Sequence, residues 1–284
     1  MARKLTKPVL IIPDVHGRMF WIDAVNRYEK EIASGKMEVV FLGDYLDVYG
    51  FEVTEGRAVN SKQAVELFEE IIDFKKEHPK NVHLLLGNHD MHYYSNVYAK
   101  NIYLCRYDHT NGKHICKLFQ ENKELFQLAW DCKIGDTLVL FTHAGVLKSW
   151  VDEQFRGNKI KQPNKEFLNN ILESPDKEAI LTLAHAGSYR GGWGRESGSV
   201  IWADVHEHID GWNVEKWPER TVQYVYKENI YQVFGHTLSF PGNPFDTDYS
   251  GFDKPYITEH FAMLDARQAF MMNTEGEIKA ISEI

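Results

Sequence analysis

The sequence lacks cysteine pairs and long apolar runs. Its three cysteines, Cys105, Cys116 and Cys132, show no CxxC spacing, so neither a structural zinc site nor a disulfide framework is expected. No run approaches the roughly 20 apolar residues of a membrane-spanning helix, and the apolar stretch near the N-terminus is too short for a signal peptide. We therefore expect a cytoplasmic protein with reduced thiols and no membrane partner.

An excess of positive charge is also missing. The formal net charge is −9 at pH 7, which argues against non-specific binding to the nucleic-acid backbone. The sequence shows no internal repeat, low-complexity tract or linker. A chain of 284 residues is long enough for a substantial core, and we expect a single domain over residues 1–284.

Short apolar runs alternate with amphipathic segments in the first third of the chain. The runs at 9–12, 39–42 and 82–86 have the length and β-branched content of buried strands. Helical periodicity covers 18–35, and a second helix is expected from Ser61, its predicted N-cap, through Lys76. This alternation of strand and helix predicts a parallel sheet with crossover helices.

Further strands are expected in the rest of the chain. Apolar runs predict them at 137–141, 200–202 and 230–234, and alternation predicts a hairpin within 261–278. The segment 146–186 is mainly helical in character. Together with the first third of the chain, these segments predict an α/β fold.

Polar side chains directly follow five of these runs. They are Asp14, His16, Asp44, Asp47, Asn88, His89, His143 and His236. Because ligand sites in open α/β sheets form at the carboxyl ends of strands, side chains from these distant positions can converge. Carboxylate, amide and imidazole donors suit divalent ions such as manganese, iron or zinc.

The donors divide into two metal centres that share one carboxylate. The first centre takes Asp14, His16 and Asp44, and the second takes Asn88, His143, His236 and the other oxygen of Asp44. Two cations roughly 3.5–4 Å apart repel each other. A shared carboxylate screens that repulsion.

Some of these residues have simpler interpretations. Asp14 and His16 could serve as helix caps, and Asp47 or Asn88 could be an ordinary loop residue. The pattern of polar residues after five separate runs favours metal binding over each of these alternatives.

One histidine has a direct competitor. The tripeptide His-Ala-Gly occurs twice, beginning at His143 and at His185. An apolar strand precedes His143, whereas a helical segment precedes His185. Since the other expected ligands follow strands, we favour His143 and expect His185 near the end of a helix.

Five short motifs carry a family resemblance. They are DVHG at 14–17, GDYLD at 43–47, GNHD at 87–90, HAG at 143–145 and GHT at 235–237. In this order they resemble the metallophosphoesterase superfamily, and more narrowly the PPP-type serine/threonine phosphatases with their bacterial and phage relatives, which include symmetrical dinucleoside tetraphosphatases. The resemblance implies one calcineurin-like metallophosphoesterase domain, with an α/β fold whose β-sandwich of two mixed sheets is flanked by helices.

The resemblance also implies an enzyme. Such a phosphatase would hydrolyse phosphate monoesters, in a phosphoprotein or a small phosphoester, by in-line attack of a metal-bridging hydroxide. Its cofactors would be two divalent metal ions, manganese first and iron or zinc as alternatives. His89 would protonate the leaving oxygen as general acid, and Asp47 would orient His89 and favour its charged form.

One departure from the family pattern bears on the substrate. Eukaryotic-type members carry Arg-Gly after GDxxD, where this chain has Val48. Arg18, Arg190 or Arg195 could bind the substrate phosphate instead. A dinucleoside polyphosphate or phosphodiester hydrolase with the same site is the alternative function. A non-catalytic binding scaffold ranks low because no expected ligand is missing.

Overall fold

The chain divides into two compact units, each built on one sheet. The computed structural model describes residues 2–102, 106–155, 163–187, 190–192, 197–204, 207, 229–237 and 254–284. The N-terminal unit comprises Lys4–Gln127 and Ala266–Ile284, and the C-terminal unit comprises Met1–Arg3 and Leu128–Asp265. The single domain expected over residues 1–284 stays a prediction.

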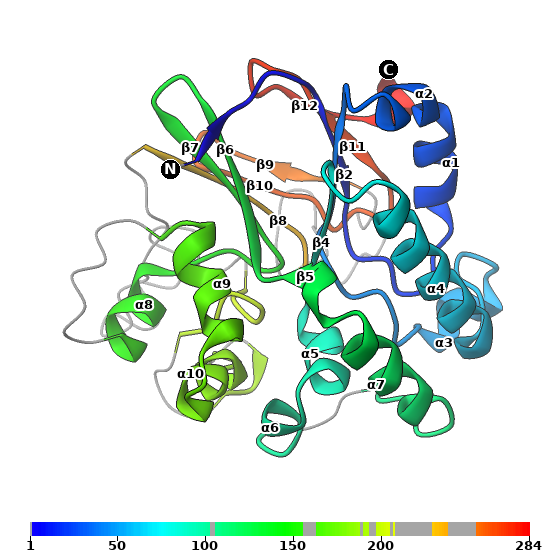
Figure 1. Ribbon diagram of the computed structural model, residues 1–284, viewed down its shortest axis with the longest axis vertical. Coiled ribbons are helices and arrows are strands. Elements are labelled where there is room, and N and C mark those ends of the chain that lie inside the picture. Colours follow the sequence, from blue (N-terminus) through cyan, green and yellow to red (C-terminus); the bar gives the residue numbers. More distant parts are fainter. Residues whose placement is uncertain are drawn as a thin grey trace. The chain divides into compact units, whose positions relative to one another are not determined.

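The N-terminal unit contains a six-stranded sheet of order β12-β11-β2-β3-β4-β5 (Figure 1). Its strands are β2 Val9–Ile12, β3 Glu38–Phe41, β4 Val82–Leu85, β5 Phe126–Gln127, β11 Phe270–Met272 and β12 Ile278–Ala280. The four strands β2 to β5 are parallel, whereas β11 runs antiparallel to β2 and to β12. All residues of β2 and β3 are buried, as in parallel sheets covered on both faces. The predicted parallel sheet is therefore confirmed.

The helices of this unit follow the expected crossovers, with two local corrections. They are α1 Phe20–Arg27, α2 Glu29–Ala33, α3 Gly50–Thr54, α4 Ser61–Glu77, α5 Asn88–Tyr94, α6 Asn96–Ala99, α7 Gly112–Glu121, and the 3₁₀ helices η1 Lys123–Leu125 and η5 Ile281–Glu283. The helix predicted over 18–35 is broken at Tyr28, whose φ of −115° is not helical. The N-cap of α4 is Asn60 and not Ser61, because Asn60 Oδ1 accepts a hydrogen bond from the Gln63 N–H at 3.1 Å.

An aromatic cluster supports the chain that leaves β3. The ring centroid of Phe68 in α4 lies 4.8 Å from that of Phe119 and 5.2 Å from that of Tyr45. Phe119 also lies 4.9 Å from Phe126. Tyr45, which follows β3, donates its hydroxyl hydrogen to Leu85 O at 2.8 Å. Packing and hydrogen bonding therefore hold this residue against the neighbouring strand.

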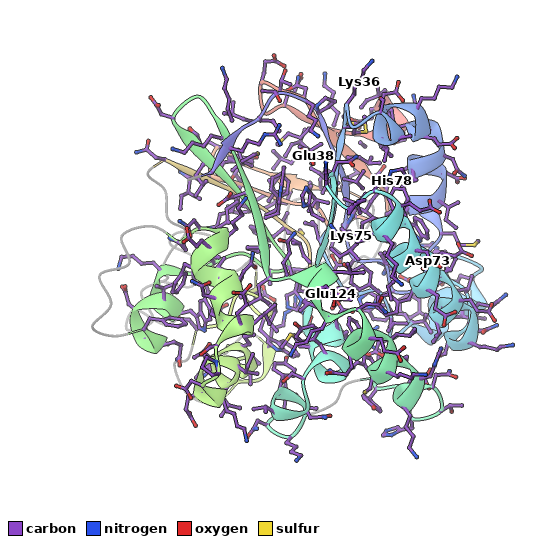
Figure 2. The ribbon with its side chains drawn as sticks, in the orientation of Figure 1. Lys36, Glu38, Asp73, Lys75, His78 and Glu124 are labelled. Carbon is purple, nitrogen blue, oxygen red and sulfur yellow. The ribbon has the colours of Figure 1, made fainter. Side chains whose placement is uncertain are left out.

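Charged side chains are paired at the opposite, amino ends of the same strands. Glu38, the first residue of β3, lies 2.8 Å from Lys7 Nζ and 3.0 Å from His83 Nε2. Lys75, near the end of α4, donates to Val82 O at 2.6 Å (Glu38 and Lys75 are labelled in Figure 2). The charged side chains at the amino ends of these strands are thus paired within the unit.

The C-terminal unit contains the second six-stranded sheet, of order β1-β6-β7-β8-β10-β9. Its strands are β1 Arg3–Lys4, β6 Ala129–Ile134, β7 Thr137–Thr142, β8 Ile230–Phe234, β9 Tyr256–Ile257 and β10 Phe261–Met263. Its helices are α8 Lys148–Gln154, α9 Lys165–Glu173, α10 Lys177–Leu181 and the 3₁₀ helix η2 Thr182–Ala184. β7, β8 and β10 are parallel neighbours, while β6 and β9 run antiparallel at either side of them.

Two strand predictions in the later part of the chain need correction. Residues 200–202 form a turn and not a strand, because Ser199 O accepts the N–H groups of Trp202 and Ala203, each at 2.8 Å. The expected hairpin exists as β11 and β12, but β10 pairs in parallel with β8 in the other sheet. The predicted fold class is confirmed, since two mixed six-stranded sheets are flanked by helices. Within the described ranges, no helix has the length and apolar character needed to cross a membrane.

A buried ion cluster joins three segments of the N-terminal unit. Glu52 in α3 is fully buried. It accepts from Arg18 Nε at 2.7 Å and lies 2.8 Å from the second nitrogen of Arg267. Burial alone would raise the pKa of Glu52, but the hydrogen bonds and charges of the two guanidinium groups outweigh it and lower the pKa.

Glu52→Gln should destabilise the fold by about 3–5 kcal/mol at pH 7, because two buried cations lose their counter-ion. The folded-state pKa is lowered, so the stabilisation is complete above the ordinary value of 4.5 and is lost as the pH falls through the folded-state pKa. Urea unfolding at pH 7 and at pH 3 should show the difference between wild type and variant shrinking in acid.

Glu55→Gln is the matched control. Glu55 pairs with Arg57 at 3.2 Å on the surface, and its replacement should change stability by less than about 1 kcal/mol. Equal effects of the two substitutions would show that the buried cluster does not support the fold.

Candidate functional site

Three predicted metal ligands meet at the carboxyl ends of β2 and β3. Asp14, His16 and Asp44 are buried, and each offers a ligand atom within 4.8 Å of the others. His16 Nδ1 lies 2.7 Å from Leu46 O. Because a carbonyl oxygen only accepts, Nδ1 donates this hydrogen bond, and Nε2 is the nitrogen that a metal could bind.

The second ring nitrogen of His16 lies close to a carboxylate. His16 Nε2 is 3.4 Å from Asp44 Oδ2, so a single cation could contact both atoms. The donor set of carboxylate and imidazole fits a borderline divalent cation, so the residues present suit the metal that the sequence predicts.

Asp90 holds the backbone of Asp44 in place. Its carboxylate accepts the N–H groups of Asp44 at 2.7 Å, Gly87 at 2.8 Å and Tyr45 at 3.1 Å. Burial and the charge of Asp44 raise the pKa of Asp90 well above its usual value, although the three N–H groups act in the opposite direction. Asp90 thereby joins the loop after β3 to the start of α5.

Several predicted site residues have a strained backbone. Among described residues other than glycine, His16, Asp44, Asp47 and His236 have φ values of 43°, 51°, 57° and 68°. Side chains larger than glycine seldom occupy this left-handed region. Such strain persists only where surrounding contacts enforce it, and it is concentrated at functional sites.

Close approach of two loops explains the glycine after β4. A methyl group at Gly87 would overlap Oδ1 of Asp44, and one at Gly43 would come within 2.5 Å of Gly87 N. Asn88, the predicted amide ligand, follows directly as the first residue of α5 and is buried. The absence of a side chain at Gly87 therefore leaves room for the Asp44 carboxylate.

Asp47 forms the predicted pair with His89 and has further partners. His89 Nδ1 and His92 Nε2 each lie 2.9 Å from Asp47 Oδ2, and the hydroxyl of Tyr93 donates to Oδ1. Burial would raise the pKa of Asp47, but hydrogen bonds from the two histidines lower it below 3.8. The carboxylate therefore stays ionised at neutral pH.

The protonation of His89 differs from the expectation. Burial lowers its pKa below 6.5, in spite of the charges of Asp44 and Asp47. The neutral imidazole is thus favoured at neutral pH, whereas a carboxylate partner alone predicted the imidazolium. The physical reason is that burial destabilises the charged imidazolium by more than the nearby carboxylates stabilise it.

Arg106 lies against the outer nitrogen of His89. One guanidinium nitrogen is 2.8 Å from His89 Nε2, and another donates to the carbonyl oxygen of Asp47 at 2.8 Å. A guanidinium group has only donors, so Nε2 accepts and the imidazole hydrogen lies on Nδ1. The guanidinium carbon lies 3.6 Å from the ring centroid of Tyr49.

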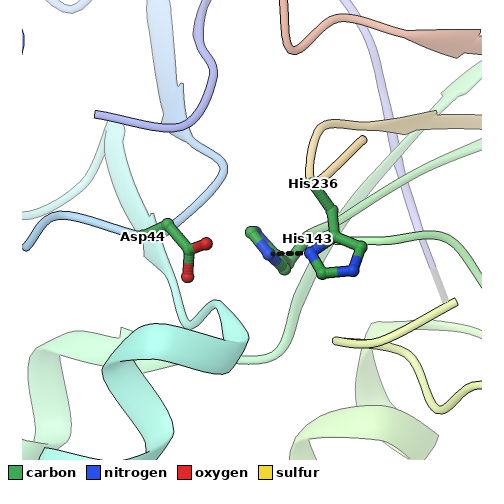
Figure 3. A group of neighbouring side chains, drawn as sticks. All are labelled: Asp44, His143 and His236. Carbon is green, nitrogen blue, oxygen red and sulfur yellow. Dashed lines mark hydrogen bonds between the residues drawn. The ribbon is translucent and has the colours of Figure 1, made fainter. Parts of the chain in front are cut away.

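The C-terminal unit brings its two predicted ligands together. His143 follows β7 and His236 follows the parallel neighbour β8. His143 Nε2 lies 3.1 Å from His236 Nδ1, the dashed line in Figure 3, which also labels Asp44 of the N-terminal unit. The N–H of Gly235 donates to His143 O at 2.7 Å. Two imidazole nitrogens at this separation can bind the same cation.

The competing histidine lies elsewhere in that unit. His185 follows the 3₁₀ helix η2, and its carbonyl oxygen accepts from Ser199 N at 2.8 Å. It ends a helical segment, as its sequence context indicates.

The three arginines expected at the substrate phosphate have different surroundings. Arg18 is buried and hydrogen-bonded to Glu52 through Nε and a second nitrogen, at 2.7 and 3.0 Å. Arg190 lies beside His236, where it pairs with Asp204 Oδ2 at 2.7 Å and donates to Thr237 Oγ1 at 2.7 Å. Arg195 lies outside the described residues. All three assignments stay predictions.

A model of the calcineurin-like phosphoesterase family matches residues 7–240. The match covers most of the chain and includes all five motifs. The chain belongs to the calcineurin-like phosphoesterase family. The superfamily resemblance of the motifs is therefore confirmed.

Three solved structures resemble this phosphoesterase chain weakly. A protein serine/threonine phosphatase from Saccharomyces cerevisiae, with similarity to human phosphatase PP5, is 15% identical; the match covers 96% of this chain and 79% of that one, with a TM-score of 0.49. A hypothetical protein from Pyrococcus horikoshii OT3 is 12% identical over 49% and 56% of the chains, with a TM-score of 0.31. A sulfate thiohydrolase from Thermus thermophilus is 9% identical over 96% and 56%, with a TM-score of 0.37.

Several contacts of this phosphoesterase site involve residues that the motifs do not assign. Asp90, the last residue of the GNHD motif, accepts three N–H groups, and its place in the motif does not indicate this. The sequence could have placed His92 near His89, because it lies three positions later and so shares a face of α5. Nothing in the local sequence marks Tyr93 or Arg106 as a neighbour of Asp47.

Gly87→Ala should weaken manganese binding to this phosphoesterase roughly 10- to 100-fold, the usual effect of disturbing the groups around a metal ligand. The new methyl group would push aside the carboxylate of Asp44, which the sequence predicts as the shared ligand. Calorimetric titration with manganese measures the change.

Gly50→Ala is the control, because a methyl group there meets no atom within 4 Å. If Gly87→Ala and Gly50→Ala bound manganese equally well, Asp44 would not be a metal ligand.

Proposed function

We propose that this phosphoesterase is a dinuclear metal-dependent phosphatase that hydrolyses phosphate monoesters of a phosphoprotein or a small molecule. Family membership supports the reaction class. The observation that carries the proposal is the buried group of Asp14, His16 and Asp44 beside the hydrogen-bonded Asp47–His89 pair.

The proposed metal ligands follow the order of the family motifs. Asp14, His16 and Asp44 would hold one ion, and Asn88, His143 and His236 would hold the other together with Asp44. When bound, two divalent ions would lower the pKa of water and neutralise developing charge on the phosphoryl group. Manganese is the first choice, with iron or zinc as alternatives.

His89 would act at the leaving oxygen. His89 Nδ1 donates to Asp47 Oδ2, with 2.9 Å between the two atoms, so the ring is oriented with Nε2 away from the carboxylate. Since Nε2 accepts a hydrogen bond from Arg106 in the structure, His89 would first take up a proton from solvent at Nε2. Asp47 would stabilise the resulting imidazolium, and the proton would then pass from Nε2 to the departing oxygen. His92 and Tyr93 support this arrangement because they contact the same carboxylate, His92 at Oδ2 and Tyr93 at Oδ1.

Arg190 is the better supported of the predicted phosphate-binding arginines that the structure describes. Its side chain is partly exposed and lies beside His236, whereas that of Arg18 is enclosed by an ion pair. A phosphoryl oxygen near the ligand His236 could therefore reach Arg190. Arg195 stays a third candidate.

A substrate panel tests the proposed function. Purified protein with manganese should hydrolyse para-nitrophenyl phosphate and a phosphopeptide faster than dinucleoside tetraphosphate. Activity should disappear in excess chelator and return with manganese, because the proposed reaction needs bound cations to lower the pKa of water and to neutralise charge on the phosphoryl group. Faster cleavage of dinucleoside tetraphosphate would favour the anhydride alternative, and full activity in chelator after long dialysis would contradict the metal-dependent mechanism.

His89→Asn should lower kcat by roughly 10²- to 10⁴-fold, the contribution of a general acid, while manganese affinity stays close to that of wild type. The comparison variant is His114→Asn, because His114 is exposed and pairs with Glu69 at 2.9 Å. Steady-state rates with para-nitrophenyl phosphate measure both. A turnover number equal to that of wild type would remove His89 from the reaction.

A further inference from the structure

The residue after the position that lacks the family arginine supports a different arginine. Val48 and Tyr49 follow Asp47 in this chain. The ring of Tyr49 lies 3.6 Å from the guanidinium carbon of Arg106, and 5.0 Å from the ring of His16. Stacking on an aromatic face holds a guanidinium group in one plane and leaves its edge open for hydrogen bonds.

Arg106 forms no ion pair with a carboxylate within the described part of the chain. Its acceptors are the carbonyl oxygen of Asp47 and the imidazole nitrogen of His89. By contrast, Arg18 pairs with Glu52 and Arg190 pairs with Asp204. A stacked, partly buried guanidinium without a carboxylate is well suited to an anionic ligand.

The position of Arg106 is enforced by its surroundings. Its φ is 57°, in the left-handed region that residues with side chains seldom occupy. His16, Asp44 and Asp47 of the same unit share this property. Arg106 is thus held in a strained conformation beside Asp47 and the predicted acid His89.

We propose that Arg106 binds phosphoryl oxygens of the substrate next to His89, in place of the arginine that the family carries at position 48. The inference rests on the proposed phosphoesterase function and adds a residue to it. Substrate oxygens would replace His89 Nε2 as the acceptor of the guanidinium N–H. Nε2 would then face the leaving oxygen instead of Arg106.

Two phosphoryl groups could provide these oxygens. One is the group that is transferred, and the other is a phosphate in the leaving group of an anhydride. Both offer the same chemistry, a negatively charged oxygen that accepts from two guanidinium nitrogens. Monoester and anhydride substrates distinguish them, because only the anhydride has the second phosphate.

Arg106→Gln and Arg106→Lys test the inference. With manganese present, Arg106→Gln should lose about 100-fold in kcat/KM, and Arg106→Lys should lose less because the charge remains. Arg27→Gln is the charge-matched control, since Arg27 donates to Ile281 O at 3.0 Å on the surface. An equal loss for para-nitrophenyl phosphate and dinucleoside tetraphosphate assigns Arg106 to the transferred group, and a larger loss for the tetraphosphate assigns it to the leaving group.

Binding of inorganic phosphate to the manganese-loaded protein, measured by calorimetry, is a second readout that needs no turnover. Arg106→Gln should bind phosphate at least 10-fold more weakly than Arg27→Gln. Tyr49→Ala should weaken phosphate binding and Tyr49→Phe should not, because only the aromatic face is needed. Thermal unfolding of each variant establishes that it is folded.

The outcomes separate this inference from the proposed function. Normal kcat/KM and normal phosphate binding in both Arg106 variants, with an active wild type, would overturn the role of Arg106 and leave the phosphatase function intact. A wild type that neither bound manganese nor hydrolysed any of the substrates would overturn the proposed function. In that case a phosphate titration of the metal-free wild type and of metal-free Arg106→Gln would still decide whether Arg106 binds an anion.

Discussion

The predicted site of the N-terminal unit depends on one buried carboxylate, that of Asp90. It accepts three backbone N–H groups from the loops that follow β3 and β4. These bonds hold Asp44 with a φ of 51°, a conformation that costs free energy and needs such support. The close contact at Gly87 completes the arrangement, because no side chain there competes with the Asp44 carboxylate. The direction of a predicted metal ligand therefore depends on the backbone groups that surround it.

Asp47, in the loop after β3, contacts several further groups of the predicted site. Its side chain collects His89, His92 and Tyr93, and its carbonyl oxygen accepts from Arg106. One residue thus connects the proposed acid with a guanidinium group through separate side-chain and backbone bonds. Since the hydrogen bonds of its histidine partners keep its pKa low, this loop retains a negative charge within a buried environment.

The strands were largely predictable because their signals are local. The runs at 9–12 and 230–234 correspond to β2 and β8, since a short β-branched run between turn residues has few other uses. The run at 200–202 shows the limit of this argument. Those residues are apolar because the core of the C-terminal unit buries Val200 and Ile201, yet hydrogen bonds to Ser199 O make them a turn. Burial of apolar residues by itself does not distinguish a strand from a turn.

The sequence by itself determined which donor residues follow which strands, and so the family and the two-sheet fold. The place of a residue after a strand can be recognised from the local sequence pattern alone. Five motifs in one order identify a family even when each motif by itself is weak. Tertiary structure alone decided the partners of those donors. Glu52 meets Arg267, Asp90 meets Asp44, and Arg106 meets His89. These contacts join segments separated by loops and crossovers, and no periodicity in a sequence encodes the distance between them.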